Sequence, residues 1–357
     1  MNFAPSEEQA LLQETVRSYA ARECSPEQVR RIFDDDVGAA PEVWNALGGL
    51  GLHGLLVPEE YGGLQLELID AALAFEALAE GAIPGPFLGH TLACLALAIA
   101  GTPEQKHAWL PQLATGAATA TFAAAEDGLR WQPDDWQMRL ESGRLTGTKM
   151  LVPSPSSADV WIIGTAGGGL ALVEAGAAGA RTEPFDGVDR TRRLENISLK
   201  DTPAQPLAIE AGGRVRDAAL VLLAADAFGC ATRLLRETVE YVSTREQFDT
   251  PLAQFQGIKH QLADLLTALE PARALYWYAA HAFDHLPDES ERAAAIGKAH
   301  VVDRATDVAR ESIELHGGIA FTWECFVHLW YKRIMADRAL FGGPDVHRER
   351  AARLAGW

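Results

Sequence analysis

The sequence is poor in cysteine, and the few that it has are not arranged for a disulfide framework or a zinc site. The 357 residues include four cysteines, Cys24, Cys94, Cys230 and Cys325, and no two of them form a C-x-x-C pair. Disulfide scaffolds and zinc sites need closely or regularly spaced cysteines. The ten histidines contain no H-E-x-x-H pattern. We therefore expect buried, reduced thiols and no metal site.

Positive charge is also in deficit. The chain has 31 Lys and Arg residues against 49 Asp and Glu residues, which gives a formal net charge of -18. An acidic chain repels nucleic-acid phosphates, so this balance argues against DNA or RNA binding. An anionic substrate would need a local basic patch to overcome the overall field.

The sequence lacks a leader pattern and a long apolar run. Met1 to Glu8 shows no basic segment followed by an apolar one, as a secretory signal would. The longest apolar stretch, around Leu92 to Ala100, is too short to cross a bilayer. These features predict a cytoplasmic protein without a membrane partner.

Three successive patterns of residue composition and hydrophobic periodicity run along the chain, and they predict three domains. Residues 1–115 read as helices, opened by an N-cap signature at Ser6. In residues 116–213, short apolar runs alternate with Gly, Asp, Pro and Ser, a pattern typical of a small antiparallel β-domain. Residues 214–357 return to helical periodicity. The chain is too long for one ordinary core, which fits this division.

The last domain is predicted to be a four-helix bundle. Apolar residues recur at three- and four-residue steps from Val215 to Val242, as a buried bundle helix requires. We expect further helices at about Phe255 to His285, closed by Pro287, at about Ser290 to Leu315, and at about Trp323 to Leu340. The predicted class is therefore mainly α, with a middle β-domain that forms a barrel or sandwich.

Four short strings then carry a resemblance to a known family. They are Pro58–Gly63 (PEEYGG), Leu145–Lys149 (LTGTK), Arg245–Phe248 (REQF) followed by Phe255-Gln256, and His316–Thr322 (HGGIAFT). Their order and spacing along nearly the whole chain resemble the acyl-CoA dehydrogenases. In the last string Ala320 replaces the family's third Gly.

The resemblance implies FAD as cofactor and an acyl-CoA thioester as substrate. In that family FAD lies at a subunit interface: its ring sits against the β-domain of one subunit, and the bundle of a neighbour holds its ADP half. A glutamate removes the α-proton while a hydride leaves the β-carbon for the flavin. The base must lie within hydrogen-bond reach of that proton, and the flavin carries the redox chemistry.

Carried over residue by residue, the resemblance assigns Arg245, Gln247, Phe248, Phe255 and Gln256 to the nucleotide end of FAD. A guanidinium on a loop can grip pyrophosphate through its planar fork. The alternative for Arg245 is a surface salt bridge with a nearby glutamate, Glu246 or Glu240.

The glycine turn is the second part of this predicted half-site. Gly317 and Gly318 would let the backbone approach the dinucleotide closely, although a plain turn between helices would use the same residues. Glu314 stands where the family has glutamine. A carboxylate there is unfavourable near pyrophosphate unless it points away or pairs with a cation.

The ring-side site departs further from the family. Its T-E-P-x-x-G-S-D loop corresponds here to Ala125–Trp131 (AEDGLRW), without the Thr, Pro and Ser. The family's W-I-T after the hairpin lysine becomes Leu151-Val152-Pro153, and Pro153 lacks a backbone N–H.

The catalytic base is also missing at both positions that the family uses. Gly342 and Ala219 occupy them, and neither side chain can accept a proton. Asp217 is two residues from Ala219, about 200° around a helix, so it should face elsewhere. Asp345, expected on a loop, is the weak stand-in.

We therefore predict an acyl-CoA dehydrogenase-like subunit, an oxidoreductase acting on a CH–CH bond, which works only with a paralogous catalytic subunit. The expected assembly is α2β2, similar to bacterial enzymes for bulky or steroid side-chain acyl-CoAs. Its electron acceptor is left open, with an electron-transfer flavoprotein as one candidate. Three alternatives remain: an active homo-oligomer with an atypical base, a related flavin monooxygenase or oxidase, and a flavin-free structural subunit.

Overall fold

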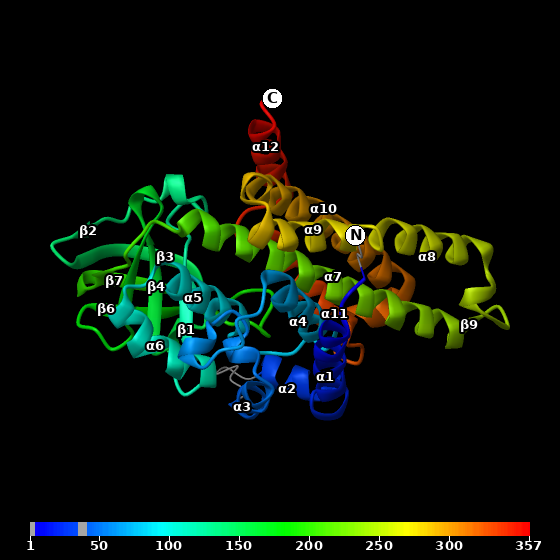
Figure 1. Ribbon diagram of the computed structural model, residues 1–357. Helices are drawn as coiled ribbons and strands as arrows, with labels where there is room; N and C mark the ends of the chain where they lie inside the picture. The colour runs from blue at the N-terminus through cyan, green and yellow to red at the C-terminus, as the bar shows by residue number, and fades with distance from the viewer. Residues whose placement is uncertain (1–3, 35–40) are drawn as a thin grey trace. The chain divides into compact units, whose positions relative to one another are not determined.

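The structure, a computed structural model, describes residues 4–34 and 41–357 (Figure 1). It divides into two compact units, each made of separate stretches of chain. Met1–Asp34, Ala72–Ile83 and Val221–Trp357 form the bundle unit, and Asp35–Ala71 and Pro84–Leu220 form the sheet unit. The predicted domain boundaries at 115/116 and 213/214 rest on changes of composition and hydrophobic periodicity along the sequence, and they stay a prediction.

The bundle unit consists of helices around α10, which lies against α8, α9, α11 and α12. Two helices, α4 and α7, pass from one unit into the other. The elements are α1 (Glu7–Glu23), α2 (Pro26–Asp34), α4 (Leu68–Glu80), α7 (Gly212–Thr244), β9 (Glu246–Gln247), β10 (Thr250–Pro251), η6 (Leu252–Gln254), α8 (Gln256–Leu269), α9 (Ala272–His285), α10 (Pro287–His316), η7 (Gly317–Phe321), α11 (Val327–Ala339) and α12 (Pro344–Leu354).

The sheet unit packs helices against two four-stranded sheets. Its helices are α3 (Pro41–Gly49), η1 (Leu52–Gly54), η2 (Glu59–Tyr61), α5 (Phe87–Ala100), α6 (Pro103–Thr115), η3 (Pro133–Asp135), η4 (Pro155–Ser157) and η5 (Ala166–Gly168). Its strands are β1 (Ala120–Ala123), β2 (Leu140–Glu141), β3 (Arg144–Pro153), β4 (Val160–Thr165), β5 (Gly169–Glu174), β6 (Ala180–Phe185), β7 (Leu194–Pro203) and β8 (Gln205–Pro206). The sheet orders are β1-β4-β5-β8 and β2-β3-β7-β6.

The predicted class, helical segments around a middle β-region, is confirmed, and the strands of the sheet unit all lie between residues 116 and 213. The two sheets share an apolar core that includes Trp161, Ile163 and Ile197, and neither closes into a barrel among the described strands. One pair departs from the expectation of antiparallel strands. β1 and β4 run parallel, because the chain between them leaves the sheet to form β2 and β3.

Two predicted helices of the bundle were wrong in their bounds. The segment expected as one helix over 255–285 is α8 and α9, which are separated at Glu270 and Pro271. Proline has no N–H for the helix ladder, and its ring clashes with the preceding turn. The helix expected at about Trp323 to Leu340 is α11, which begins only at Val327, and a further helix, α12, follows it.

The first bundle helix, α7, is apolar on nearly all sides. Among the described residues it alone is long and apolar enough to cross a membrane by length and composition, with a mean hydropathy of 1.7 in its most apolar window. However, 89% of that window is buried inside the structure. This burial is what the core helix of a bundle requires.

Candidate functional site

The end of α7 forms a short hairpin that carries the predicted phosphate-binding arginine. Arg245 directly follows α7, and its backbone N–H donates to the Tyr241 carbonyl, 2.8 Å away. β9 and β10 then pair as Thr250 with Gln247. The Arg245 side chain is exposed, and among the described residues it has no hydrogen bond or ion pair. The alternative of a salt bridge to Glu246 or Glu240 is therefore not what the structure contains.

Phe248 is held in an unusual conformation at the tip of this hairpin. Phe248 and Asp249 both have positive φ values, 56° and 60°, which is the geometry of a tight two-residue hairpin and is rare for a bulky residue. The Phe248 side chain is 88% exposed, and its ring meets that of Phe255 edge-on, with centroids 6.4 Å apart. Strain of this kind is concentrated at binding sites.

The glycine turn follows α10 and uses conformations that need glycine. Gly317 caps α10 with φ 68° and ψ -147°, a region open almost only to glycine. No atom lies within 4 Å of a Cβ built on Gly317 or Gly318, so their backbone is open to a ligand. Ala320, in place of the family's third Gly, is buried within η7.

A contact between α7 and α10 brings these two predicted motifs together. The rings of Tyr241 and His316 stack with centroids 4.3 Å apart and planes inclined by 19°. The Tyr241 hydroxyl also donates to the His316 carbonyl at 3.2 Å. His316 Nδ1 lies 2.8 Å from the Ser312 carbonyl, and burial lowers the pKa of His316. Arg245 and Gly317 therefore lie on adjacent ends of two packed helices.

Tyr241 was not singled out in the sequence, although it lies one helical turn before Arg245. That spacing was the available signal.

The two helix ends border a cavity of about 290 Å³ that is acidic rather than basic. Its lining includes Glu237, Glu240 and Glu324 together with Tyr241 and His316. Three carboxylates would repel a pyrophosphate inside this cavity. A dinucleotide would instead lie over the exposed side, where Arg245 and Gly318 are open. Glu314 is exposed on the last turn of α10 and does not line the cavity.

In the sheet unit, the loop at the family's flavin-contacting position is closed on itself. Glu126 and Arg130 form an antiparallel bridge. Between them, Gly128 and Leu129 take φ values of 76° and 56°. Trp131, at the end of the loop, is buried. The loop is therefore a tight turn, whose backbone groups at Glu126 and Arg130 bond to each other rather than to a ligand.

Glu126 is a structural residue, held by a buried lysine. Its carboxylate accepts Lys149 Nζ at 2.9 Å and the backbone N–H groups of Gln137 and Met138 at 2.7 and 3.0 Å. Burial would raise the pKa of Glu126, but the hydrogen bond from Lys149 and the two backbone donors outweigh it and lower the pKa. Lys149, the last residue of the LTGTK string, is fully buried below the ring of Trp136. The pair is a fixed support for the loop.

The segment that replaces the family's W-I-T is irregular. The register of β3 against β7 shifts between Lys149 and Val152, which marks a β-bulge. Leu151 has φ 52°, and its N–H donates to the Asn196 side chain at 3.2 Å. The carbonyl of Pro153 accepts the Thr121 hydroxyl at 2.5 Å. The backbone groups that could face a ring are thus used within the sheet unit.

Neither predicted base position can carry a base. Ala219 is fully buried in α7. Gly342 has φ 101°, and a Cβ there would lie 3.3 Å from His347 Nε2. Asp217, on the same helix as Ala219, pairs with Arg216 at 3.0 Å.

Asp345 was expected on a loop, and this was wrong, because it lies in the first turn of α12. Its side chain is 95% exposed and pairs with Arg348 at 3.0 Å. A solvated carboxylate of this kind lacks the shielded environment of a catalytic base.

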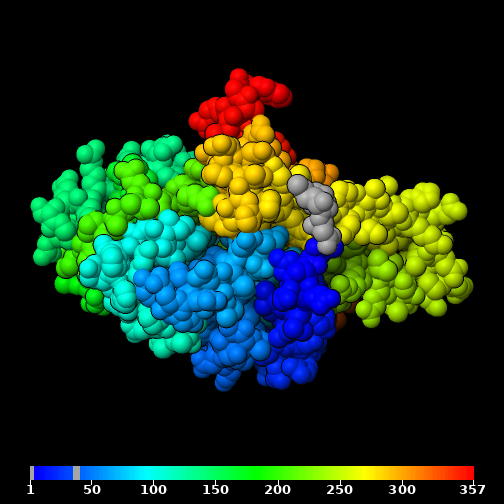
Figure 2. Space-filling view, viewed as in Figure 1, coloured from blue at the N-terminus to red at the C-terminus, as the bar shows by residue number. Residues whose placement is uncertain are grey.

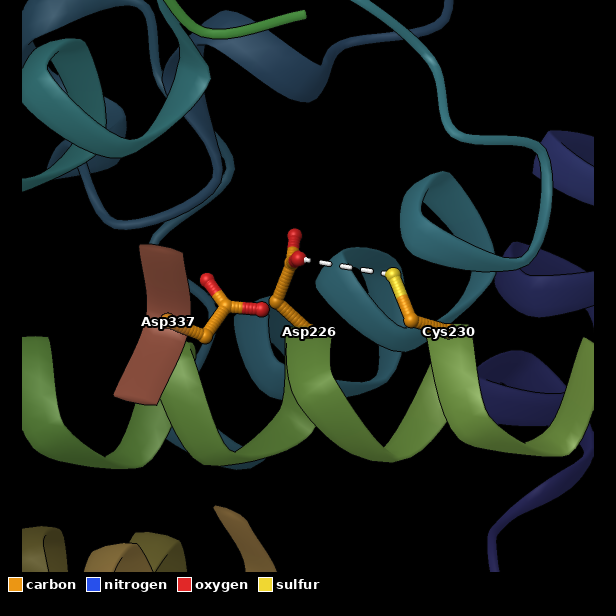
Figure 3. A group of neighbouring side chains, drawn as sticks. All are labelled: Asp226, Cys230 and Asp337. Carbon is orange, nitrogen blue, oxygen red and sulfur yellow. Dashed lines mark hydrogen bonds between the residues drawn. The ribbon is translucent and has the colours of Figure 1, made fainter. Parts of the chain in front are cut away.

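The structure also assembles a group of potential metal ligands that the sequence did not predict. Asp226, Cys230 and Asp337 are buried, and their ligand atoms all lie within 4.8 Å of one another (Figure 3). However, Arg333 donates Nε and Nη2 to the two oxygens of Asp226 at 2.8 and 2.7 Å. This guanidinium already neutralises Asp226, so a cation would meet a positive charge at the same carboxylate. The group is best described as a buried ion pair beside a thiol and a second buried carboxylate, Asp337.

Similarity to known proteins agrees with the predicted family. A model of the acyl-CoA dehydrogenase N-terminal domain matches residues 6–117, and one of the C-terminal domain matches residues 219–355. The acyl-CoA dehydrogenase IpdE2 of Mycobacterium tuberculosis is 34% identical over 99% of this chain and 98% of its own.

Two solved structures extend the similarity to the fold. A variant of the Tcur3481-Tcur3483 steroid ACAD superposes with a TM-score of 0.92 at 29% identity, over 98% of each chain. PigA with FAD and proline superposes with a TM-score of 0.88 at 25% identity, over 100% of this chain and 99% of the other. By sequence, domain match and fold, the chain belongs to the acyl-CoA dehydrogenase family.

Proposed function

We propose that this chain is the non-catalytic subunit of a hetero-oligomeric acyl-CoA dehydrogenase. It holds the ADP half of an FAD whose ring lies in a paralogous partner, and the partner supplies the glutamate that removes the α-proton. The substrate is an acyl-CoA with a bulky group, such as a steroid side chain. The solved steroid ACAD that superposes on this chain carries two designations in its name, Tcur3481 and Tcur3483, which supports a pairing of two different subunits. Its description as a steroid ACAD supports the substrate class.

The observation that carries the proposal is an asymmetry between two parts of the chain. In the bundle unit, an exposed arginine without a partner among the described residues stands beside an open glycine turn. In the sheet unit, the loop that should face a flavin ring is bonded to itself. Neither base position carries a carboxylate, Ala219 in the sheet unit or Gly342 in the bundle unit. Such a chain can bind a nucleotide but has no group of its own to take the α-proton.

The residues at the end of α7 and α10 fit the ADP half of FAD. Arg245 offers a guanidinium fork for a pyrophosphate, and Gly317 and Gly318 let a backbone N–H approach it. The strained, exposed ring of Phe248 offers a face for stacking. When bound, FAD supplies the hydride acceptor. This chain's own residues position the nucleotide.

Exposed apolar side chains near this half-site support a subunit interface. Around the hairpin, α8 and the glycine turn, the exposed large apolar residues are Phe248, Phe255, Leu266, Ile319, Phe321 and Trp323. The hairpin and α8, yellow-green to yellow in Figure 2, lie at the surface of the face shown. Clustered exposed apolar groups mark interaction sites. A partner subunit that brings its own flavin would cover them.

The test is to purify the full chain alone and again together with a paralogous subunit that has the catalytic glutamate. We expect the lone chain to be colourless and inactive, and the complex to carry FAD and to oxidise an acyl-CoA. A lone chain that is yellow and reduces its flavin with an acyl-CoA would refute the partner model in favour of an active homo-oligomer. Oxygen consumption without acyl-CoA would indicate a monooxygenase or oxidase, and a complex without FAD would indicate a structural subunit.

A further inference from the structure

Three arginines line a second cavity of the bundle unit, which shares Pro26 and Trp330 with the acidic cavity. They are Arg17 on α1 and Arg233 and Arg236 on α7, and the cavity measures about 380 Å³. The remaining lining is mostly small: Ala20, Ala21, Cys24, Ser25, Pro26, Ala77 and Gly81, with Glu80 and Trp330. In a chain with a net charge of -18, this is a local concentration of positive charge.

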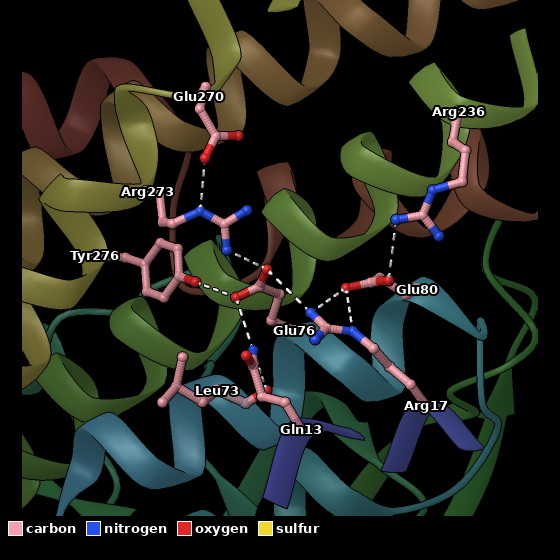
Figure 4. Close-up of polar contacts among 9 residues, drawn as sticks. All are labelled: Gln13, Arg17, Leu73, Glu76, Glu80, Arg236, Glu270, Arg273 and Tyr276. Atoms are coloured by element: carbon pink, nitrogen blue, oxygen red, sulfur yellow. Dashed lines mark hydrogen bonds and ion pairs between the residues drawn. The ribbon is translucent and has the colours of Figure 1, made fainter. Parts of the chain in front are cut away.

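Glu80 is the one carboxylate in that lining, and it is already bonded to Arg17 (Figure 4). Arg17 donates Nε and Nη2 to the same oxygen, Oε1, at 3.0 and 2.7 Å. The nearest nitrogen of Arg236 stays 3.7 Å from Oε2, which is too long for a hydrogen bond. Arg236 is 60% exposed, and this long ion pair with Glu80 is its one polar contact among the described residues. Its donors are therefore available to a ligand.

Arg233 adds a second donor that is short of a partner. Its Nη2 pairs with Glu237 at 2.6 Å, but Glu237 faces the acidic cavity and does not line this one. The Nε of Arg233 is buried and has no hydrogen-bond partner in the described structure. A buried unsatisfied donor is costly and calls for an explanation, and an acceptor on a ligand provides one.

The walls of the cavity are fixed in place. Trp330 Nε1 donates to the carbonyls of Ala79 and Glu80, at 3.2 and 3.1 Å, which holds the indole as one wall. The guanidinium of Arg233 lies 5.3 Å from the centre of that ring. Behind Glu80, the buried Glu76 is compensated by Arg273 and Tyr276 (Figure 4). Arg17, Arg233 and Trp330 are thus held in place, and Arg236 is the side chain that must be ordered when an anion binds.

We propose that this cavity binds a small phosphate monoester, with its phosphoryl group held by Arg236 and Arg233. Guanidinium forks match phosphate oxygens and form strong charge-assisted hydrogen bonds with them. The volume suits a small metabolite, since ligand pockets typically measure about 300–1,000 Å³. The neighbouring Glu237, Glu240 and Glu324 would repel a second anionic group, which favours a ligand with a single charged end.

This site is distinct from the proposed FAD half-site. Neither Arg245 nor the glycine turn at Gly317 and Gly318 lines the arginine cavity. The two sites can therefore be tested separately in the same protein.

The experiment is calorimetric titration of the full chain, alone and in complex with its partner, with inorganic phosphate and with glycerol 3-phosphate. We expect one saturable site per chain, absent when sodium chloride of matched ionic strength is added instead. Arg236→Gln should weaken the binding at least about tenfold, since losing one charge-assisted contact costs about 1.4 kcal/mol or more. Arg245→Gln should leave it unchanged.

Arg236 is the residue to replace, because it is exposed and supports no other described contact closer than 3.7 Å. Circular dichroism of the variant checks that the fold is kept. Binding that is equal in Arg236→Gln and in the unmodified chain, or that is lost in Arg245→Gln instead, would overturn the proposal. So would tighter binding of malonate than of phosphate, because the site would then be one for carboxylates.

Discussion

The ion pair between Asp226 and Arg333 should be the most sensitive polar contact of the bundle unit. The side chains are 1% and 3% exposed. Asp226 accepts two hydrogen bonds from Arg333, and the remaining Nη1 of Arg333 donates to the Ile83 carbonyl at 2.8 Å. The pair links α7 to α11 and to the end of α4. Removing the charge of Asp226 would take from the buried Arg333 the carboxylate that accepts two of its hydrogen bonds.

We expect Asp226→Asn to lower the free energy of unfolding by about 3–5 kcal/mol, the range for breaking a buried ion pair from one side. The amide keeps one acceptor oxygen, which places the expected value near the lower end. The matched control is Asp307→Asn. Asp307 pairs with Arg304 at 3.1 Å on α10, but the two side chains are 44% and 36% exposed, so the loss should stay below about 1 kcal/mol.

The measurement is urea unfolding of the full chain, monitored by the circular dichroism of its helices. Both variants are compared with the same dependence of unfolding free energy on urea concentration. A second variant, Asp226→Leu with Arg333→Met, removes both charges together and also removes the donor to the Ile83 carbonyl. Its loss should be smaller than that of Asp226→Asn, because an unpaired carbonyl costs about 1–3 kcal/mol. An Asp226→Asn variant as stable as Asp307→Asn would refute this reasoning.

Three further predictions concern the cofactor, acid stability and the base position. Arg245→Ala should weaken FAD retention in the complex about ten- to a hundredfold, since charge-assisted hydrogen bonds contribute about 1.5–3 kcal/mol. Flavin absorbance of the complex after gel filtration measures the FAD that is retained. The control is Arg181→Ala, which replaces an exposed arginine on β6 and should leave FAD retention unchanged. Burial lowers the pKa of His53 to about 4 and that of His90 to about 3. Below about pH 6.5 the folded chain therefore binds fewer protons than the unfolded chain. The free energy of unfolding should then fall by about 1.4 kcal/mol per histidine for each pH unit from pH 6.5 towards pH 4. Urea midpoints that stay constant from pH 7 to pH 5 would contradict this. Gly342→Glu should not create dehydrogenase activity in the lone chain and should destabilise it by about 1–2 kcal/mol, because its backbone has φ 101°; acyl-CoA-dependent dye reduction by the purified variant would prove this wrong.

Much of the fold could be predicted from local patterns. Ser6 caps α1 as expected, with the Gln9 N–H donating to its hydroxyl at 3.2 Å. The apolar runs of the sheet unit became β1, β4 and β5. The errors arose where one local signal outweighed another. Helical periodicity continued across Pro271 and hid the break between α8 and α9.

The candidate site was only partly predictable. The strings around Arg245 and Gly317 indicated a nucleotide half-site, but its assignment to FAD stays a prediction. Tyr241, which joins the two strings through its stacking with His316, gave no motif of its own. The arginine cavity was not predicted either, because Arg17 and Arg236 lie far apart in the sequence and no short pattern connects them.

The sequence by itself determined the succession of helical, β and helical regions, the family, and the lack of a carboxylate at Gly342 and Ala219. These depend on residue type and on spacing along the chain. Only the tertiary structure decided that Lys149 is used to hold Glu126, that Arg333 neutralises Asp226, and that Arg236 is left with donors to spare. The physical reason is that a charged group's role depends on which partners and how much water surround it, and packing brings those partners from distant parts of the chain.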